Sequence, residues 1–413
     1  MSATIPDTTK EELRSRIKTA IDRERDHIVE VAETIRTNPE FQFEEFMASQ
    51  LLADSLREVG FDVEKPYCGL ETGFRATLRS GRPGPTVAVL AEYDALRGIG
   101  HGCGHNLIGA SGLASAIGMA EVIDEIGGTF IVLGTPAEEG GAGKVIEMEH
   151  GAFDDIDACL MIHHHGNTAG APTQWPDGTC LAVTGYDIEY FGKPAHSAND
   201  PYNGVNALNA VIKLFTGIDA LRQHVTMDTR IHGIITDGGQ AANVVPKYAS
   251  ARISVRAASR DYVGELCRKL ESIAEGAALM TGCQVKLTKG NELYDMRPSY
   301  VIGAAYQKNM EELGLNLTIP REGRGMHSTD FGNISYKVPS VTGGFAISHE
   351  PIPGHSQEVV EASGSAYGYD QFLKVSTAMT LTALDILTTP NLSMQAWDEL
   401  GHWAEQHERM TGA

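Results

Sequence analysis

The chain has 413 residues, of which 42% are apolar and 21% are charged, and its 54 acidic residues outnumber its 33 basic ones to give a net charge of −21. This balance is typical of a soluble globular protein and argues against nucleic acid or an anionic membrane as a partner. The length predicts two domains, and no uninterrupted apolar run is long enough to span a bilayer.

The N-terminal residues, Met1 to Asp7, lack the basic flank and the apolar core of a signal peptide. The six cysteines are scattered along the chain and do not form the tight framework of a disulfide-rich protein. We therefore expect free thiols and a cytoplasmic location.

The first 60 residues predict helices that cover a sheet. Apolar residues recur at helical spacing from Leu13 to Ile35, and Asn38-Pro39 ends this first helix. A second helix runs from about Phe46 to Gly60. Neither helix shows a residue pattern that indicates chemistry.

From about residue 61, short strands and helices alternate, which predicts an α/β domain with a mostly parallel or mixed sheet. The expected strands are 74–78, 86–90, 129–133 and 158–162, and the expected helices are 107–126 and about 144–148. The continuous apolar runs in these strands fit burial on both faces of the sheet.

Residues 181–296 follow the order β-α-β-β-α-β, which is the ferredoxin-like arrangement. We predict that they form a separate α+β domain inserted into the first. Residues 1–180 and 297–413 would then make up the larger domain, whose second part contains a helix at 300–313, a strand at 338–343 and a helix at 365–387.

Candidate metal ligands follow three of the predicted strands. In chain order they are Glu92, Asp94, His101, Cys103 and His105, then Glu138 and Glu139, then His163, His164 and His165. In open α/β sheets, ligands bind beyond the carboxyl ends of the strands, so we expect these side chains to converge. Nitrogen and sulfur donors beside carboxylates suit a zinc-like ion. The sequence therefore predicts a metal-dependent hydrolase.

Spacing narrows the candidates within each cluster. Cys103 and His105 are two residues apart and would share one face of an extended segment. Of the adjacent Glu138 and Glu139, one could bind metal while the other moves protons for an attacking water. In the histidine triplet we favour His163, although the sequence leaves open which of the three binds metal.

Two C-terminal loops carry further polar residues. The loop around His355 could supply a late metal ligand. Arg324 could bind a substrate carboxylate in bidentate fashion, and an ordinary surface arginine is an equally good interpretation.

Six segments together resemble the M20 metallopeptidase/amidohydrolase family, in particular its aminobenzoyl-glutamate hydrolase-like and N-acyl amino acid amidohydrolase branch. They are Ala91–Leu96, Gly100–Asn106, Pro136–Gly141, Gly192–Ser197, Asn243–Pro246 and Ser328–Asn333. The resemblance spans nearly the whole chain. One departure is Arg97, which stands where a proline is usual.

The resemblance implies a zinc-peptidase-like, mixed-sheet catalytic domain and an inserted lid that forms a homodimer. It also implies one or two divalent ions, zinc or manganese, bound by Cys103, His105, Glu139, His163 and His355. Glu138 would be the general base, and His196 and Asn243 of the lid would stabilise the tetrahedral oxyanion. Asp94 would orient a metal-binding histidine, which leaves Glu92 and His101 with structural roles.

The function predicted from these residues is hydrolysis of a C–N bond in a small N-acyl or N-aroyl amino acid or a dipeptide-like amide. The alternative enzyme is an aminohydrolase that releases ammonia from a small amine. A non-catalytic metal-binding homologue is the alternative from another class, and the presence of Glu138 beside Glu139 argues against it.

Overall fold

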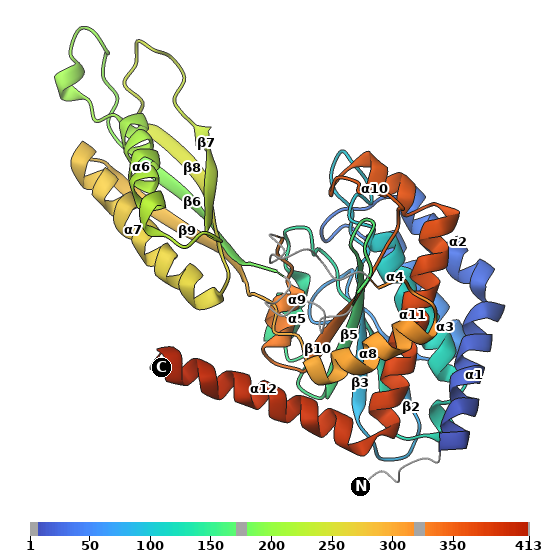
Figure 1. Ribbon diagram of the computed structural model, residues 1–413. Helices are drawn as coiled ribbons and strands as arrows, with labels where there is room; N and C mark the ends of the chain where they lie inside the picture. Colours follow the sequence, from blue (N-terminus) through green and yellow to red (C-terminus); the bar gives the residue numbers. More distant parts are fainter. Residues whose placement is uncertain (1–6, 171–179, 318–326, 412–413) are drawn as a thin grey trace. The chain divides into compact units, whose positions relative to one another are not determined.

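The computed structural model describes residues 7–170, 180–317 and 327–411 of the chain (Figure 1). The chain divides into two compact units. Unit 1 comprises the described residues of Met1–Gly178, Arg297–Gly323 and Asn333–Ala413, and unit 2 those of Thr179–Met296 and Arg324–Gly332. Each unit has its own sheet and its own buried core, so each is described by itself.

Unit 1 is built on a six-stranded mixed sheet with the order β1-β2-β4-β3-β5-β10. Its strands are β1 (Asp62–Glu64), β2 (Phe74–Arg79), β3 (Thr86–Ala91), β4 (Thr129–Gly134), β5 (Ala158–His164) and β10 (Ser340–Phe345). The four strands β4, β3, β5 and β10 are parallel, whereas β1 and β2 are antiparallel to their neighbours. The predicted mixed sheet is thus confirmed. The three strands associated with the candidate metal ligands, β3, β4 and β5, are inner strands that lie next to one another.

Unit 1 also contains helices, some of which pack on this sheet. They are α1 (Asp7–Arg23), α2 (Arg25–Thr37), α3 (Phe46–Val59), α4 (His105–Ala120), α5 (Gly143–Glu149), α8 (Tyr300–Glu312), α10 (Gln357–Ala362), α11 (Ala366–Thr388) and α12 (Pro390–Thr411), while the residues of the short α9 (Phe331–Ser335) are divided between the two units. Helix α4 packs on β3, β4 and β5 and is itself covered by α1, α2, α3 and α11. Because α4 is buried along nearly its whole length, its first residue, His105, lies in the interior.

The N-terminal helix predicted from Leu13 to Ile35 is two helices, because Glu24 leaves the helical conformation with φ −94° and ψ 11°. The hydrogen bonds continue across this point, from Glu24 N to Ala20 O and from Ile28 N to Glu24 O. The irregularity is therefore local. The apolar spacing on either side still faces the core, through residues such as Ile17 and Ile28.

Unit 2 contains a four-stranded antiparallel sheet with the order β7-β8-β6-β9. Its elements are β6 (Ala182–Phe191), α6 (Ala207–Leu221), β7 (Arg230–Asp237), β8 (Tyr248–Ala257), α7 (Arg260–Thr281) and β9 (Gln284–Leu293). Both helices pack on the sheet around a core that includes Tyr190, Leu214, Ile253 and Leu270. Chain order and strand order together are those of a ferredoxin-like fold. None of the described helices combines the length and the apolar composition that a membrane-spanning helix requires.

Candidate metal centre

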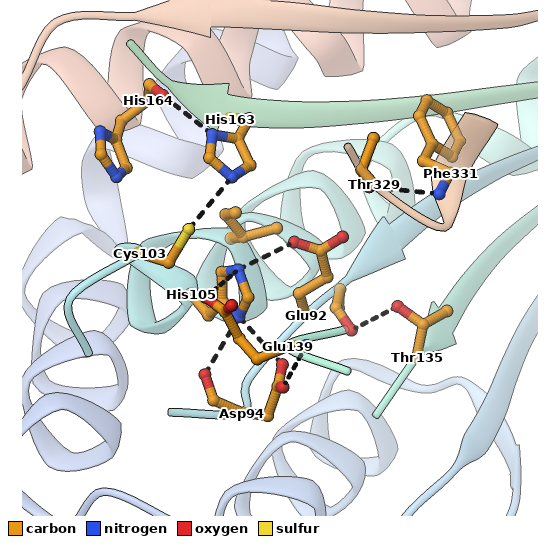
Figure 2. Close-up of polar contacts among 12 residues, drawn as sticks. Glu92, Asp94, Cys103, His105, Thr135, Glu139, His163, His164, Thr329 and Phe331 are labelled. Atoms are coloured by element: carbon orange, nitrogen blue, oxygen red, sulfur yellow. Dashed lines mark hydrogen bonds and ion pairs between the residues drawn. The ribbon is translucent and has the colours of Figure 1, made fainter. Parts of the chain in front are cut away.

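The carboxyl ends of β3, β4 and β5 meet at one edge of the unit 1 sheet, and the candidate ligands follow them (Figure 2). Asp94 lies just beyond β3, Glu139 lies beyond β4, and His163 is the sixth residue of β5. The register of the parallel strands brings these ends level with one another. This is the position at which open α/β sheets bind ligands.

Asp94 orients His105. Its Oδ1 lies 2.9 Å from His105 Nδ1, and its backbone oxygen lies 3.0 Å from the same nitrogen. Nδ1 therefore carries a proton, and Nε2 is the ring nitrogen that can bind metal once it is unprotonated. Nε2 is buried and has no hydrogen-bond partner, as expected of a nitrogen that binds metal. Burial alone would raise the pKa of Asp94, but the adjacent His105 ring holds this pKa below its ordinary value.

Cys103 and His163 approach His105 from the other side. Cys103 Sγ lies 3.6 Å from His163 Nε2, and each of the three residues offers one ligand atom within 4.8 Å of the others. In Figure 2 the His163 ring points toward Cys103, whereas the His164 ring, which stacks on that of His163 with centroids 5.2 Å apart, has no drawn contact with Cys103. Burial raises the pKa of the Cys103 thiol to about 12, so the thiolate would form here only beside a cation.

The segment around Cys103 is not extended, contrary to the argument made from spacing. His105 is the first residue of α4, and Gly104 before it has a left-handed φ of 69°. A Cβ atom at Gly104 would lie 2.7 Å from His164 Cδ2. Glycine is therefore needed here for both its conformation and its size. A turn, rather than a strand face, brings Cys103 and His105 together.

Glu139 and His355 complete the cluster. Glu139 Oε1 lies 3.7 Å from His355 Nε2 and 4.0 Å from His105 Nε2, and this oxygen is buried without a hydrogen-bond partner. Cys103, Glu139 and His355 form a second group with ligand atoms within 4.8 Å of one another, and His105, Glu138 and Glu139 form a third. The groups share members, which is the arrangement expected of adjacent ions.

Glu92 and His101, to which the sequence argument gave only structural roles, have different neighbours. Glu92 is fully buried, forms a 2.7 Å ion pair with Lys144 and has Oε2 3.5 Å from His105 Nε2. His101 is also buried, burial lowers its pKa to about 3, and it belongs to none of the metal-binding groups found among the described residues.

Lys144 was not predicted from the sequence. A lysine in a short helix is by default a solvated surface residue, and only its burial beside Glu92 reveals its role.

In unit 2, the predicted residues His196 and Asn243 lie on adjacent backbone segments. Ser197 N donates to Asn243 O at 3.0 Å, and the backbones of His196 and Val244 pair in antiparallel fashion. His196 Nδ1 accepts hydrogen bonds from the backbone N–H groups of Ala198 and Asn199, at 3.2 and 3.0 Å. The proton of a neutral His196 must therefore reside on Nε2, and the exposed ring can donate it outward.

Arg256 of β8 is a residue that the sequence argument missed. It is partly buried, and its guanidinium donates to the Ser328 hydroxyl at 3.1 Å. No carboxylate lies within 4.0 Å of it among the described residues of the chain, and burial lowers its pKa. Arg324, the predicted substrate-binding arginine, lies outside the described residues.

Comparison with known proteins by family model, by sequence and by fold leads to the same group of proteins. Residues 83–367 match the model of peptidase family M20/M25/M40. The Xaa-Arg dipeptidase of Mus musculus is 34% identical over 92% of this chain and 90% of its own length. One of the two p-aminobenzoyl-glutamate hydrolase polypeptides of Escherichia coli is 35% identical over 65% of this chain and 59% of its own length. In fold, the chain resembles a dinuclear metal-binding M20 peptidase from Bacillus subtilis, with a TM-score of 0.64 and 18% identity over 88% of this chain and 99% of that one.

Proposed function

Because the chain belongs to peptidase family M20/M25/M40 and is a metal-dependent hydrolase of C–N bonds, we propose that it cleaves the amide bond of a small N-acyl or N-aroyl amino acid or dipeptide. The observation that carries this proposal is the meeting of His105 Nε2 and Glu139 Oε1 beside Cys103. Both atoms are buried, both lack a hydrogen-bond partner, and Asp94 fixes the ring of the first.

The five proposed metal ligands are Cys103, His105, Glu139, His163 and His355. Cys103, His105 and His163 would hold one ion, and Glu139 and His355, with Cys103 nearby, would hold a second. Divalent ions held by these residues would supply a hydroxide nucleophile near neutral pH and would polarise the carbonyl of the amide. The mixed nitrogen, sulfur and oxygen donors suit zinc, and manganese is the alternative.

Charge balance favours two ions over one. Unit 1 contributes four carboxylates and, once Cys103 is deprotonated, one thiolate, while the buried Lys144 offsets one negative charge. The four carboxylates are Glu92, Asp94, Glu138 and Glu139. Two divalent ions neutralise the remainder, whereas a single ion leaves a net negative charge in a buried site, which is unfavourable.

Glu138 is the proposed general base. Its carboxylate belongs to the same compact group as His105 and Glu139, so a water bound beside these residues is within its reach. Glu138 would take a proton from the attacking water and return it to the leaving nitrogen. His196 and Asn243 would donate hydrogen bonds to the developing oxyanion. The Nε2–H tautomer of His196 supports this role.

The names of the two relatives suggest the substrate class. Each describes a compound in which an acyl group is joined to an amino acid, arginine in one case and glutamate in the other. The feature common to both is a free α-carboxylate. Arg324 remains the predicted partner for it, and Arg256, whose guanidinium has no carboxylate partner among the described residues, is a second candidate.

We further propose that unit 2 acts as a lid and forms a homodimer. Its edge strand β7 exposes Ile234 and Ile235, and the end of α7 exposes Leu279 and Met280. Edge strands with exposed apolar side chains favour pairing with another chain. Cys68, Cys103, Cys159, Cys267 and Cys283 are free thiols, which supports the proposed cytoplasmic location.

Replacing Glu138 with Gln tests the function. The variant should keep its metal content and lose hydrolysis of N-acyl-arginine and N-acyl-glutamate substrates, measured as release of the free amino acid. Glu149→Gln, at the exposed end of α5, is the matched control and should retain activity. Wild-type turnover in Glu138→Gln would exclude Glu138 as the base. Release of ammonia without release of an amino acid would favour the deaminase alternative.

A further inference from the structure

The segment between α2 and α3 runs alongside both loops that carry the proposed metal ligands. Glu40 O accepts a hydrogen bond from Ala95 N at 2.8 Å, in the loop after β3. The side-chain amide of Gln42 donates to the backbone oxygen of Glu139, in the loop after β4. Arg97, in the loop after β3, also binds this segment, through an ion pair of 3.0 Å with Glu44. The segment therefore fastens two loops that are far apart in sequence.

Glu45 makes the deepest of these connections. Its side chain is fully buried, Oε1 accepts a hydrogen bond from Ala137 N at 2.9 Å, and Oε2 accepts one from the Thr72 hydroxyl at 2.8 Å. Thr72 is in turn held through its backbone oxygen, which accepts from the buried hydroxyl of Tyr93. Both carboxylate oxygens of Glu45 are thus occupied, and neither contacts a proposed metal ligand.

The partner of Glu45 has an unusual backbone conformation. Ala137 has a φ of 59°, in the left-handed region that residues other than glycine seldom adopt. Two residues later, Glu139 N donates to Asp94 Oδ2 at 2.9 Å. Glu138 therefore lies between two backbone N–H groups, each of which is held by a buried carboxylate. This arrangement fixes the backbone of Glu138 from both sides.

We propose that Glu45 is a positioning residue for the general base. By accepting the hydrogen bond from Ala137 N–H, it fixes the backbone just before Glu138 and so the direction in which the Glu138 side chain points. This inference rests on the proposed function, because it assumes that Glu138 moves the proton. Glu45 contacts neither the substrate nor the ligands. Its effect is expected in turnover and not in substrate binding, since a misplaced base slows proton transfer without removing any contact with the ground-state substrate.

Four variants of the full-length, metal-loaded protein test the proposal. Glu45→Ala removes the acceptor and leaves Ala137 N–H buried without a partner. Glu45→Asp keeps the charge but withdraws the carboxylate by one methylene group. Glu45→Gln can still accept from Ala137 and can donate to Thr72. Glu40→Gln is the matched control, because the Glu40 carboxylate accepts from Met47 N and Ala48 N at the start of α3 and not from a loop of the site.

We expect Glu45→Ala and Glu45→Asp to lower kcat by about 10- to 100-fold, as is typical for residues that orient a catalytic group through one intermediate contact. KM should stay within about threefold and metal content should not change. Glu45→Gln should recover most of the lost kcat, and Glu40→Gln should resemble wild type. The aspartate variant keeps the experiment informative if the alanine variant does not fold.

Wild-type kcat in Glu45→Asp, or an equal loss in Glu45→Gln and Glu45→Ala, would overturn the positioning role. Loss of metal from Glu45→Ala or Glu45→Asp would also overturn it, because it would show that Glu45 supports the ligands instead. Failure of the proposed function would look different: Glu138→Gln would remain active whatever the Glu45 variants do.

Discussion

The carboxylate of Asp94 joins His105 to Glu139: Oδ1 lies 2.9 Å from His105 Nδ1, and Oδ2 accepts the backbone N–H of Glu139 at 2.9 Å. One side chain thus orients two of the proposed ligands, which come from different loops. A carboxylate suits this position because both of its oxygens accept hydrogen bonds.

Asp94→Asn should weaken metal binding by about 10- to 100-fold. The amide has one acceptor and one donor, so its NH₂ group must face either His105 Nδ1–H or Glu139 N–H, and two donors would then oppose each other. Titration with zinc or manganese measures the change. Asp54→Asn, which alters a surface carboxylate paired with Arg57, should bind metal as wild type does. Equal affinity in the two variants would show that Asp94 does not orient the site.

Cys103→Ser should lower metal affinity, whereas Cys68→Ser, which changes a partly exposed thiol outside the metal-binding groups, should not. Burial raises the pKa of Cys103 to about 12 in the metal-free protein, so binding must displace a proton, and affinity should rise with pH. Calorimetry in two buffers of different ionisation enthalpy counts the protons. Wild type should release about one more proton than Cys103→Ser, and an equal count would exclude the thiolate as a ligand.

His196→Ala should lower kcat by about 10²- to 10³-fold, the usual effect of removing one oxyanion donor. Metal content should stay unchanged, because His196 belongs to none of the metal-binding groups among the described residues. His224→Ala, an exposed histidine of the same unit, provides the comparison. An unchanged kcat in His196→Ala would remove this residue from the mechanism.

Glu45→Gln should stabilise the metal-free protein at alkaline pH. Burial raises the pKa of Glu45 from its ordinary value to about 7. Because the folded state binds this proton more tightly than the unfolded state, wild-type stability falls as pH rises from about 4.5 to 7, by up to about 3 kcal/mol. Gln does not titrate, so the Tm difference in favour of the variant should grow between pH 5 and 7 and then level off. A Tm difference that does not change with pH would contradict a raised pKa of Glu45.

Much of the fold follows from local patterns in the sequence. Continuous apolar strands predicted the buried sheet, and the acids and histidines that follow them predicted where the side chains of Asp94, Glu139 and His163 meet. The spacing of Cys103 and His105 predicted an extended segment, which is wrong. The left-handed Gly104 and the helix that begins at His105 cannot be recognised from an alternation pattern. The roles proposed for these residues remain predictions.

Contacts between distant segments could not be predicted in this way. Glu45 meets Ala137 across 92 positions of sequence, and it follows a predicted loop in which an acidic residue looks solvated. Lys144 pairs with Glu92 inside the protein, where a lysine is not expected. Such partners depend on the packing of whole elements, which the pattern of a single segment does not encode.

The pairing of β5 with β10 has a consequence for synthesis of the protein. Strand β5 ends at His164, and the residues that pair with it, from Ser340 onward, follow only after roughly 180 further residues have been added, including all of unit 2. At about 5–20 residues per second, the ribosome needs on the order of 10–35 s for that stretch. Through this interval the nascent sheet exposes the unpaired edge of β5, which bears His163. Premature pairing with a neighbouring nascent chain, or capture by a chaperone, would therefore occur at the strand on which the metal centre is later assembled.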